Sequence, residues 1–288
     1  MLPQRAHRMA GSLPRVLVAM AGLLLVPATP AAVVEIHAGG KIFATAEFRQ
    51  GKPDKPTVLM LHGFLQTREF GIVKSIADAL TDENYTVLSP NLSLGISHRK
   101  HSLDCEALHL HDMDGDVREI QQWVQWLRGR GHTKIIGVGH SFGATQLLAW
   151  KEQYRERDFT LVGVSMIGSA PIAFEPKPPR AAKGAASKAL DAGLIRAPLS
   201  FCEAYASPAR SYASYQHWGE NRILSAIKRS GPHTEVILGG KDKFPQAGWG
   251  KRLAGAGAKI HHIRNATHFM DGTHEFDMLE TLLGILNR

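Results

Sequence analysis

Short apolar runs alternate along this chain with longer stretches in which apolar residues recur at helical spacing. The run Thr57–Leu61 is almost continuously apolar, as expected of a strand that is buried on both faces. A later stretch places Val117, Ile120 and Val124 on one stripe, which predicts an amphipathic helix. Alternating strands and helices predict an α/β domain, with a mostly parallel sheet covered by helices on both faces.

The same patterns set bounds for each predicted element. Strands are predicted at residues 33–37, 41–48, 57–61, 85–89, 135–138, 161–167, 235–238 and 259–263. Helices are predicted around residues 73–80, 113–127, 144–150, 249–254 and 276–286. The fourth strand is predicted to stop at Pro90. In such a sheet the reactive groups gather at the carboxyl ends of the strands.

One stretch, Pro171–Pro232, breaks the alternation and contains no clear strand. Its first part is rich in proline and lysine, and its later part is aromatic, with Phe201, Tyr205, Tyr212, Tyr215 and Trp218. A long unpatterned insertion in a compact domain is usually functional or disordered. The aromatic residues favour an ordered cap over the functional site, with Tyr205 and Trp218 expected to line an apolar pocket.

The first 31 residues have the parts of a secretory signal peptide. A basic stretch ending at Arg15 precedes the apolar run Val16–Val26, and small residues follow. A bilayer span needs about 20 residues, so this run is short for one. We expect export to the periplasm or the medium, cleavage after Ala28 or Ala31, and no stable membrane anchor in the mature domain, residues 32–288. An uncleaved anchor or a buried first helix is the alternative.

The formal net charge of +8 raises the question of nucleic acid binding. Three arginines lie in the signal segment, and without them 31 basic residues face 26 acidic ones, an excess of five. So modest an excess argues against a nucleic-acid partner. The two cysteines, Cys105 and Cys202, leave two states open. They form a disulfide, which an oxidising compartment favours, or they are free thiols.

The segment Gly139-His140-Ser141-Phe142-Gly143 lies between a predicted strand and a predicted helix. A serine on so tight a turn has its hydroxyl exposed above the sheet, and the two glycines let the backbone turn without a side-chain clash. The N–H groups that begin the following helix point at the place where negative charge develops. This arrangement predicts that Ser141 is a nucleophile.

Together with Leu61-His62-Gly63-Phe64, this motif resembles the alpha/beta hydrolase superfamily over nearly the whole mature chain. The resemblance implies an α/β-hydrolase fold with an inserted cap. It also implies an oxyanion hole formed by the backbone N–H groups of Phe64 and Phe142. A turn that simply ends a strand is the alternative interpretation of the His-Gly pair.

The resemblance further implies a serine, an acid and a histidine in that order along the chain. Asp242 follows the predicted strand 235–238, and His268 follows the predicted strand 259–263. Both are therefore expected at the carboxyl edge of the sheet, as acid and base. His261 and His262 are less suitable because they lie within a strand, and Asp271 is the reserve acid.

These residues predict a serine hydrolase that cleaves small-molecule acyl esters or thioesters through an acyl-enzyme. Ser141 is the predicted nucleophile, His268 its base, and Asp242 the acid that orients the base. Epoxide hydrolases and dehalogenases of this fold use an aspartate nucleophile, and Ser141 argues against both. The alternatives are an acyltransferase that uses the same three residues and a non-catalytic binding protein on the same scaffold.

Four histidines, His98, His101, His109 and His111, cluster after the fourth predicted strand. They lack the cysteine and histidine spacing of a zinc site, so we expect solvated loop residues. No metal or cofactor is predicted.

Overall fold

The computed structural model describes residues 31–172, 188–190 and 193–288, without the side chains of residues 188–190. The predicted signal segment lies outside the described residues except for Ala31, and so does most of the basic part of the insertion. Within the described residues, no helix is long and apolar enough to cross a membrane.

The main sheet has eight strands in the order β1-β2-β4-β3-β5-β6-β10-β11. Their bounds are β1 Ala32–Gly39, β2 Ile42–Arg49, β3 Thr57–Leu61, β4 Thr86–Asn91, β5 Ile135–His140, β6 Thr160–Val164, β10 Thr234–Gly239 and β11 Lys259–Ile263. The six strands from β4 to β11 are parallel to one another. The two N-terminal strands pair antiparallel at one edge. The predicted mostly parallel sheet is confirmed.

Strand β4 runs through Pro90 to Asn91, so the prediction that Pro90 ends this strand is wrong. The pairing explains why a proline is tolerated here. The ladder between β4 and β3 ends at Leu88, whereas the ladder between β4 and β2 continues and pairs Pro90 with Ala46. Because Pro90 has a strand partner on one side only, its missing N–H leaves no bond to β3 unmade.

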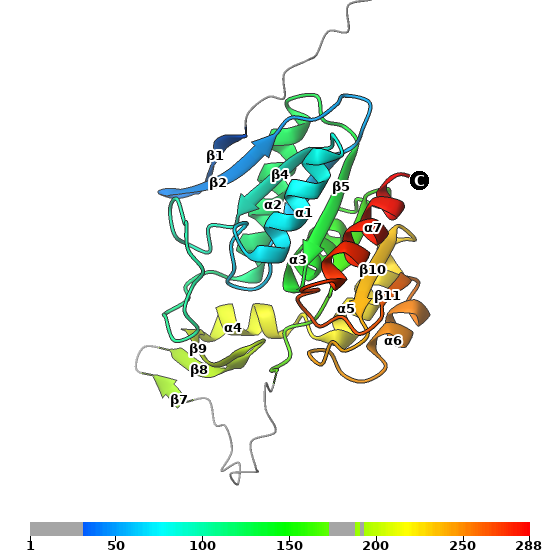
Figure 1. Ribbon diagram of the computed structural model, residues 1–288. Helices are drawn as coiled ribbons and strands as arrows, with labels where there is room; N and C mark the ends of the chain where they lie inside the picture. The colour runs from blue at the N-terminus through cyan, green and yellow to red at the C-terminus, as the bar shows by residue number, and fades with distance from the viewer. Residues whose placement is uncertain (1–30, 173–187, 191–192) are drawn as a thin grey trace, which may run out of the picture.

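Helices cover both faces of this sheet (Figure 1). On one face lie α1 Gly71–Asp82 and α7 His274–Leu286, whose apolar residues form one core cluster with β3, β5, β6 and β10. On the other lie α2 Met113–Arg128, α3 Phe142–Gln153, α5 Glu220–Ser230 and α6 Trp249–Gly255. Helix α3 is buried along most of its length, so the strand–turn–helix around Ser141 stands in the middle of the molecule.

The insertion contains strands that the sequence analysis did not predict. Strands β7 Lys188–Leu190, β8 Leu194–Leu199 and β9 Cys202–Pro208 form a small antiparallel sheet, followed by helix α4 Ala209–Gln216. This sheet lies at the end of the main sheet where the parallel strands finish (Figure 1). Prolines concealed the pattern: Pro198 sits at an irregularity in the β8–β9 pairing, and Pro208 is the last residue of β9.

The insertion is fastened to the loop that follows β4. A disulfide joins Cys105 of that loop to Cys202 at the start of β9. Nearby, the N–H of His109 donates to the carbonyl of Ala206 at 2.8 Å. Of the two states that the sequence left open for the cysteines, the structure has the disulfide.

Candidate active site

Ser141 stands at the turn between β5 and α3, with φ 56° and ψ −126°. An L-residue adopts this backbone conformation only at a cost in energy, and such strain is common at functional sites. The two glycines of the motif have no room for a side chain. A Cβ on Gly143 would lie 2.2 Å from the carbonyl oxygen of His62, and a Cβ on Gly139 would lie 2.5 Å from the nitrogen of Ala144. The turn therefore requires both glycines.

The structure brings Ser141, His268 and Asp242 together from the ends of three strands. The Ser141 hydroxyl donates to Nε2 of His268 at 2.9 Å, and Nδ1 of His268 donates to Oδ2 of Asp242 at 2.8 Å. The imidazole and the carboxylate are both buried, each with 3% of its side-chain surface exposed. The N–H of Phe244 donates to the second carboxylate oxygen of Asp242, and the Phe244 ring stacks on His268 with centroids 4.2 Å apart.

The other candidates for acid and base lie elsewhere. Asp271 accepts a hydrogen bond from Thr267 rather than from His268, and this bond lowers the pKa of Asp271. His261 lies in β11 and bonds to Glu235 of the neighbouring strand.

The two residues predicted for the oxyanion hole both lie close to Ser141. Phe142 is the first residue of α3, a position whose N–H has no partner within the helix. Phe64 follows Gly63, and a Cβ on Gly63 would lie 3.3 Å from Cβ of Ser141. The rings of Phe64 and Phe142 pack edge to face, with centroids 5.6 Å apart. This geometry places the Gly63–Phe64 peptide beside the serine.

His62 holds that peptide, a role beyond the simple turn considered from the sequence. Its Nδ1 donates to the carbonyl of Gly63 at 2.8 Å, and its Nε2 accepts from the N–H of Leu92 at 3.1 Å. Complete burial, followed by the nearby positive charge of Arg99, lowers the pKa of His62 to about 3. The ring is therefore neutral at physiological pH.

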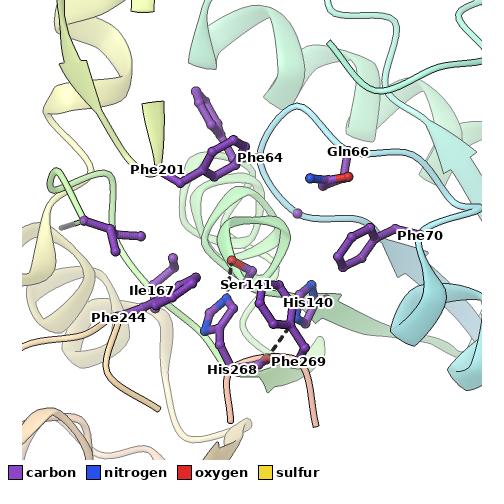
Figure 2. Close-up of a pocket in the computed structure, with 12 residues that line it drawn as sticks. Phe64, Gln66, Phe70, His140, Ser141, Ile167, Phe201, Phe244, His268 and Phe269 are labelled. Carbon is purple, nitrogen blue, oxygen red and sulfur yellow. Dashed lines mark hydrogen bonds between the residues drawn. The ribbon is translucent and has the colours of Figure 1, made fainter. Parts of the chain in front are cut away.

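A cavity of about 160 Å³ opens beside Ser141. Its lining is mostly apolar and consists of Gly63, Phe64, Gln66, Phe70, His140, Ser141, Ile167, Ile172, Phe201, Phe244, His268 and Phe269. Figure 2 shows these side chains around the serine and His268. Burial lowers the pKa of His140 to about 3, so this lining histidine is also uncharged. Among the described residues, no lysine, arginine, aspartate or glutamate lines the cavity.

Tyr205 and Trp218 do not line this cavity, so that expectation is wrong. Tyr205 belongs to β9 of the insertion and is buried, and its ring stacks on His109 with centroids 4.3 Å apart. Trp218 packs under the guanidinium of Arg222. The insertion contributes Ile172 and Phe201 to the lining instead. Sequence pattern showed an aromatic segment but could not show which rings face the cavity.

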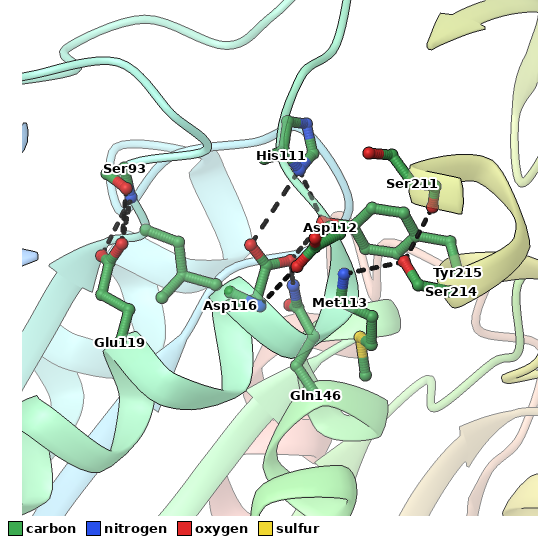
Figure 3. A network of polar contacts seen from close by, with 12 residues as sticks. Ser93, His111, Asp112, Met113, Asp116, Glu119, Gln146, Ser211, Ser214 and Tyr215 are labelled. Carbon is green, nitrogen blue, oxygen red and sulfur yellow. Dashed lines mark hydrogen bonds and ion pairs between the residues drawn. The ribbon is translucent and has the colours of Figure 1, made fainter. Parts of the chain in front are cut away.

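His109 and His111 are buried, so the expectation of solvated loop histidines is wrong for this pair. Nδ1 of His111 lies 2.5 Å from the hydroxyl of Tyr215, which in turn donates to Oδ2 of Asp116 at 2.5 Å. Gln146 also donates to Asp116, at 2.7 Å (Figure 3). These bonds connect the loop, α2, α3 and α4. In the part of the chain that the structure describes, no histidine, cysteine and carboxylate side chains are grouped as metal ligands.

This network makes a prediction about stability and pH. Burial raises the pKa of Asp116 to about 8. Between the unfolded pKa of about 4 and this value, the folded state holds a proton that the unfolded chain releases, so the free energy of unfolding falls as pH rises. We expect the free energy of unfolding, measured with urea, to fall less between pH 5 and pH 8 in Asp116→Asn than in the wild type. Asp114→Asn, on the exposed side of α2, should keep the full loss, and equal losses in all three proteins would contradict the assignment.

Both the sequence and the fold are similar to those of known proteins. Residues 58–277 match the model of the alpha/beta hydrolase family. Est1E from Butyrivibrio proteoclasticus with ferulic acid bound is similar in structure, with a TM-score of 0.64, 18% identity, and coverage of 88% of this chain and 100% of that one. The alpha/beta hydrolase GrgF from Penicillium sp. sh18 has a TM-score of 0.66 and 15% identity, covering 90% and 99%.

A third similar structure is the thioesterase domain from the curacin biosynthetic pathway, with a TM-score of 0.57 and 18% identity, covering 90% of this chain and 100% of that domain. At these identities the solved structures share the fold alone. No curated protein matches the sequence.

Proposed function

This chain belongs to the alpha/beta hydrolase family, and we propose that it is a serine hydrolase that cleaves carboxylic esters or thioesters. The observation that carries the proposal is the unbroken series of hydrogen bonds from Ser141 through His268 to Asp242, at 2.9 and 2.8 Å, beside an apolar cavity. A nucleophile bonded to a base, with the base oriented by an acid, is the arrangement that activates a serine hydroxyl.

In the proposed reaction, His268 takes the hydroxyl proton as the oxygen of Ser141 attacks the acyl carbonyl. Asp242 stabilises the imidazolium that forms, and the N–H groups of Phe64 and Phe142 donate to the oxyanion. The intermediate collapses as His268 returns the proton to the leaving alcohol or thiol, which leaves an acyl-enzyme. Water then repeats the sequence, with His268 again as base, and releases the carboxylic acid.

A panel of chromogenic oxygen esters and thioesters tests this proposal on the purified protein. Hydrolysis of at least one of them is expected, with the free acid as product. Release of the leaving group together with a new ester in the presence of added alcohol would identify acyl transfer instead. No turnover of any member and no covalent labelling would leave a binding protein on this scaffold.

The lining of the cavity supports an uncharged acyl group as the substrate's binding portion. Each methylene that is buried in such a pocket contributes at most about 0.8 kcal/mol to transition-state binding. The value of kcat/KM should rise along a series of straight-chain acyl esters and level off when the cavity is full. Esters with a charged acyl terminus should be poor substrates, because none of the described side chains that line the cavity offers an opposite charge.

Phe201→Ala should move the plateau of this series to longer chains, because Phe201 lines the cavity and its loss enlarges it. Tyr212→Ala is the matched control: it removes another aromatic ring of the insertion, one that bonds to the carbonyl of Pro198 rather than lining the cavity. kcat/KM is measured for each acyl length on all three proteins. An unchanged profile in Phe201→Ala would show that the acyl chain does not reach this side of the cavity.

We also propose that the protein is exported. The disulfide between Cys105 and Cys202 supports this, because structural disulfides persist in oxidising compartments and are rare in the cytosol. The mature protein should begin near Thr29 or Ala32. Sequencing the N-terminus of the native protein tests the proposal, and a soluble form that begins at Met1 or Leu2 would overturn it.

A further inference from the structure

Arg99 is a buried cation whose bonds all go to neutral acceptors. Its side chain lies in the loop after β4, and the residue is 4% exposed. Its guanidinium donates to the carbonyls of Leu92 at 2.7 Å and His101 at 2.9 Å, and to Nε2 of His62 at 3.1 Å. Within the described residues, no carboxylate lies within ion-pair distance of it. Burial lowers the pKa of Arg99 to about 10, so it stays charged at neutral pH.

The bonds from Arg99 and Leu92 together fix which nitrogen of His62 carries the proton. Nε2 receives two donors, the guanidinium of Arg99 and the N–H of Leu92, and must therefore be the unprotonated nitrogen. The single ring proton then resides on Nδ1, which donates to the carbonyl of Gly63. A guanidinium at Nε2 draws electron density from the ring and makes the Nδ1 proton a stronger donor.

The Gly63 carbonyl and the Phe64 N–H are the two ends of one peptide group. The chain has no cis peptide bond among its described residues, so these two groups point in opposite directions. The Gly63 carbonyl accepts from Nδ1 of His62 and also from the N–H of Gln66 at 3.1 Å. The bonds that hold this carbonyl therefore also set the direction of the Phe64 N–H, and the shorter one comes from His62. Polarisation passes along the same path, because a carbonyl that accepts a stronger hydrogen bond makes the N–H of its own peptide a stronger donor.

We propose that Arg99 is a positioning residue, which acts through His62 and the Gly63–Phe64 peptide to aim and strengthen the Phe64 N–H that binds the oxyanion. The part of this inference that concerns the oxyanion rests on the proposed hydrolase function. The part that concerns the proton of His62 and the direction of the peptide does not. Two measurements separate them.

The first measurement is the tautomer of His62 in the wild-type protein. Long-range ¹H–¹⁵N correlation of histidine-labelled protein should show a neutral ring protonated on Nδ1 throughout the range from about pH 5 to pH 8, because the pKa of His62 is about 3. A ring protonated on Nε2 could not accept from Arg99, and this result would overturn the proposal. The measurement needs no substrate and no variant.

The second measurement is kinetic. It distinguishes a role in positioning the peptide from a role in which Arg99 only stabilises the loop after β4. Loss of a direct oxyanion donor lowers kcat by about 10²-fold or more, so an indirect contact predicts a drop of about tenfold in Arg99→Met, with KM nearly unchanged. Arg99→Lys keeps a charged donor and should recover part of kcat. Unfolding temperatures are measured for each variant, and rates are compared well below them.

Arg68→Met is the matched control, because Arg68 also lies close enough to lower the pKa of His62 but pairs with Glu69 and does not bond to the ring. Its kcat should stay close to the wild-type value. Equal kcat losses in Arg99→Met and Arg68→Met would overturn the proposal, since a general loss of positive charge would then explain both. If the wild type turns over no ester, the hydrolase assignment fails. The chemical shift of the His62 Nδ1 proton in the wild type, Arg99→Met and Arg68→Met then still decides whether Arg99 acts on the ring, because the bond from Leu92 remains in all three proteins and only the loss of Arg99 should move this shift.

Discussion

Ser141→Ala should abolish both ester turnover and labelling by a fluorophosphonate probe. The hydroxyl of Ser141 is the group that His268 can activate, because it lies 2.9 Å from Nε2 of that ring. Serine hydrolases lose about 10⁶-fold in kcat when the nucleophile is removed, and what remains comes from the oxyanion hole and substrate binding. The loss is measured as kcat on the best ester of the panel and as probe incorporation by mass spectrometry.

His268→Ala should cause nearly as great a loss, because the serine is then without its base. Asp242→Asn should lose less, since residues of such a unit are not additive and the acid only orients and stabilises the ring. The buried side chains of the pair keep water from replacing the missing contact.

Ser165→Ala is the matched control for these variants. Ser165 follows the neighbouring strand β6, is fully buried, and has φ 52°, so it shares the backbone strain of Ser141 without a histidine partner. This variant should keep both turnover and labelling. Turnover that survives in Ser141→Ala but disappears in Ser165→Ala would show that the nucleophile has been assigned to the wrong strand.

Replacing both cysteines by serine should lower the free energy of unfolding by about 4 kcal/mol. The bond between Cys105 and Cys202 closes a loop with a sequence separation of 97 residues. Cross-linking so long a loop removes much of the conformational entropy of the unfolded chain, which is the main source of the stabilisation in the chain-entropy model. For a domain of this size, the loss corresponds to about 10 °C in Tm.

Urea unfolding of the double variant and of the wild type, each with and without reductant, measures this effect. Reductant should bring the wild type to the stability of the variant and leave the variant unchanged. Titration in denaturant without reductant should find no reactive thiol in the wild type. Two reactive thiols per chain, or equal stability of the two oxidised samples, would contradict the expected contribution.

The main sheet could be predicted because each of its strands has a recognisable pattern in the local sequence. Runs such as Thr57–Leu61 are buried along their whole length and need no distant partner to be recognised. The positions of Ser141, Asp242 and His268 at strand ends follow from the same reading, since in a parallel sheet chain order decides which edge each loop occupies. The hydrogen bonds between these three side chains could not be predicted. They depend on side-chain rotamers and on the conformations of the loops after the strands, which the sequence pattern does not specify.

The small sheet and the buried polar groups were missed because their partners are remote in sequence. Leu194–Leu199 becomes a strand by pairing with Cys202–Pro208, and the disulfide fixes that hairpin on another loop. His111 looks like a loop residue until Tyr215 and Asp116 are brought beside it. Arg99 likewise has no local pattern that marks it, since all that distinguishes it is what it contacts after folding.

Phe201, which lines the cavity, immediately precedes Cys202, so the disulfide to the loop after β4 is one residue away from the wall of the proposed substrate pocket. The oxidation history of a preparation is therefore a variable in any measurement of specificity. Protein recovered from a reducing cytoplasm and protein recovered from an oxidising compartment share one sequence and one proposed nucleophile. Their values of kcat/KM should be equal for the smallest esters and should differ once the acyl group is large enough to contact Phe201.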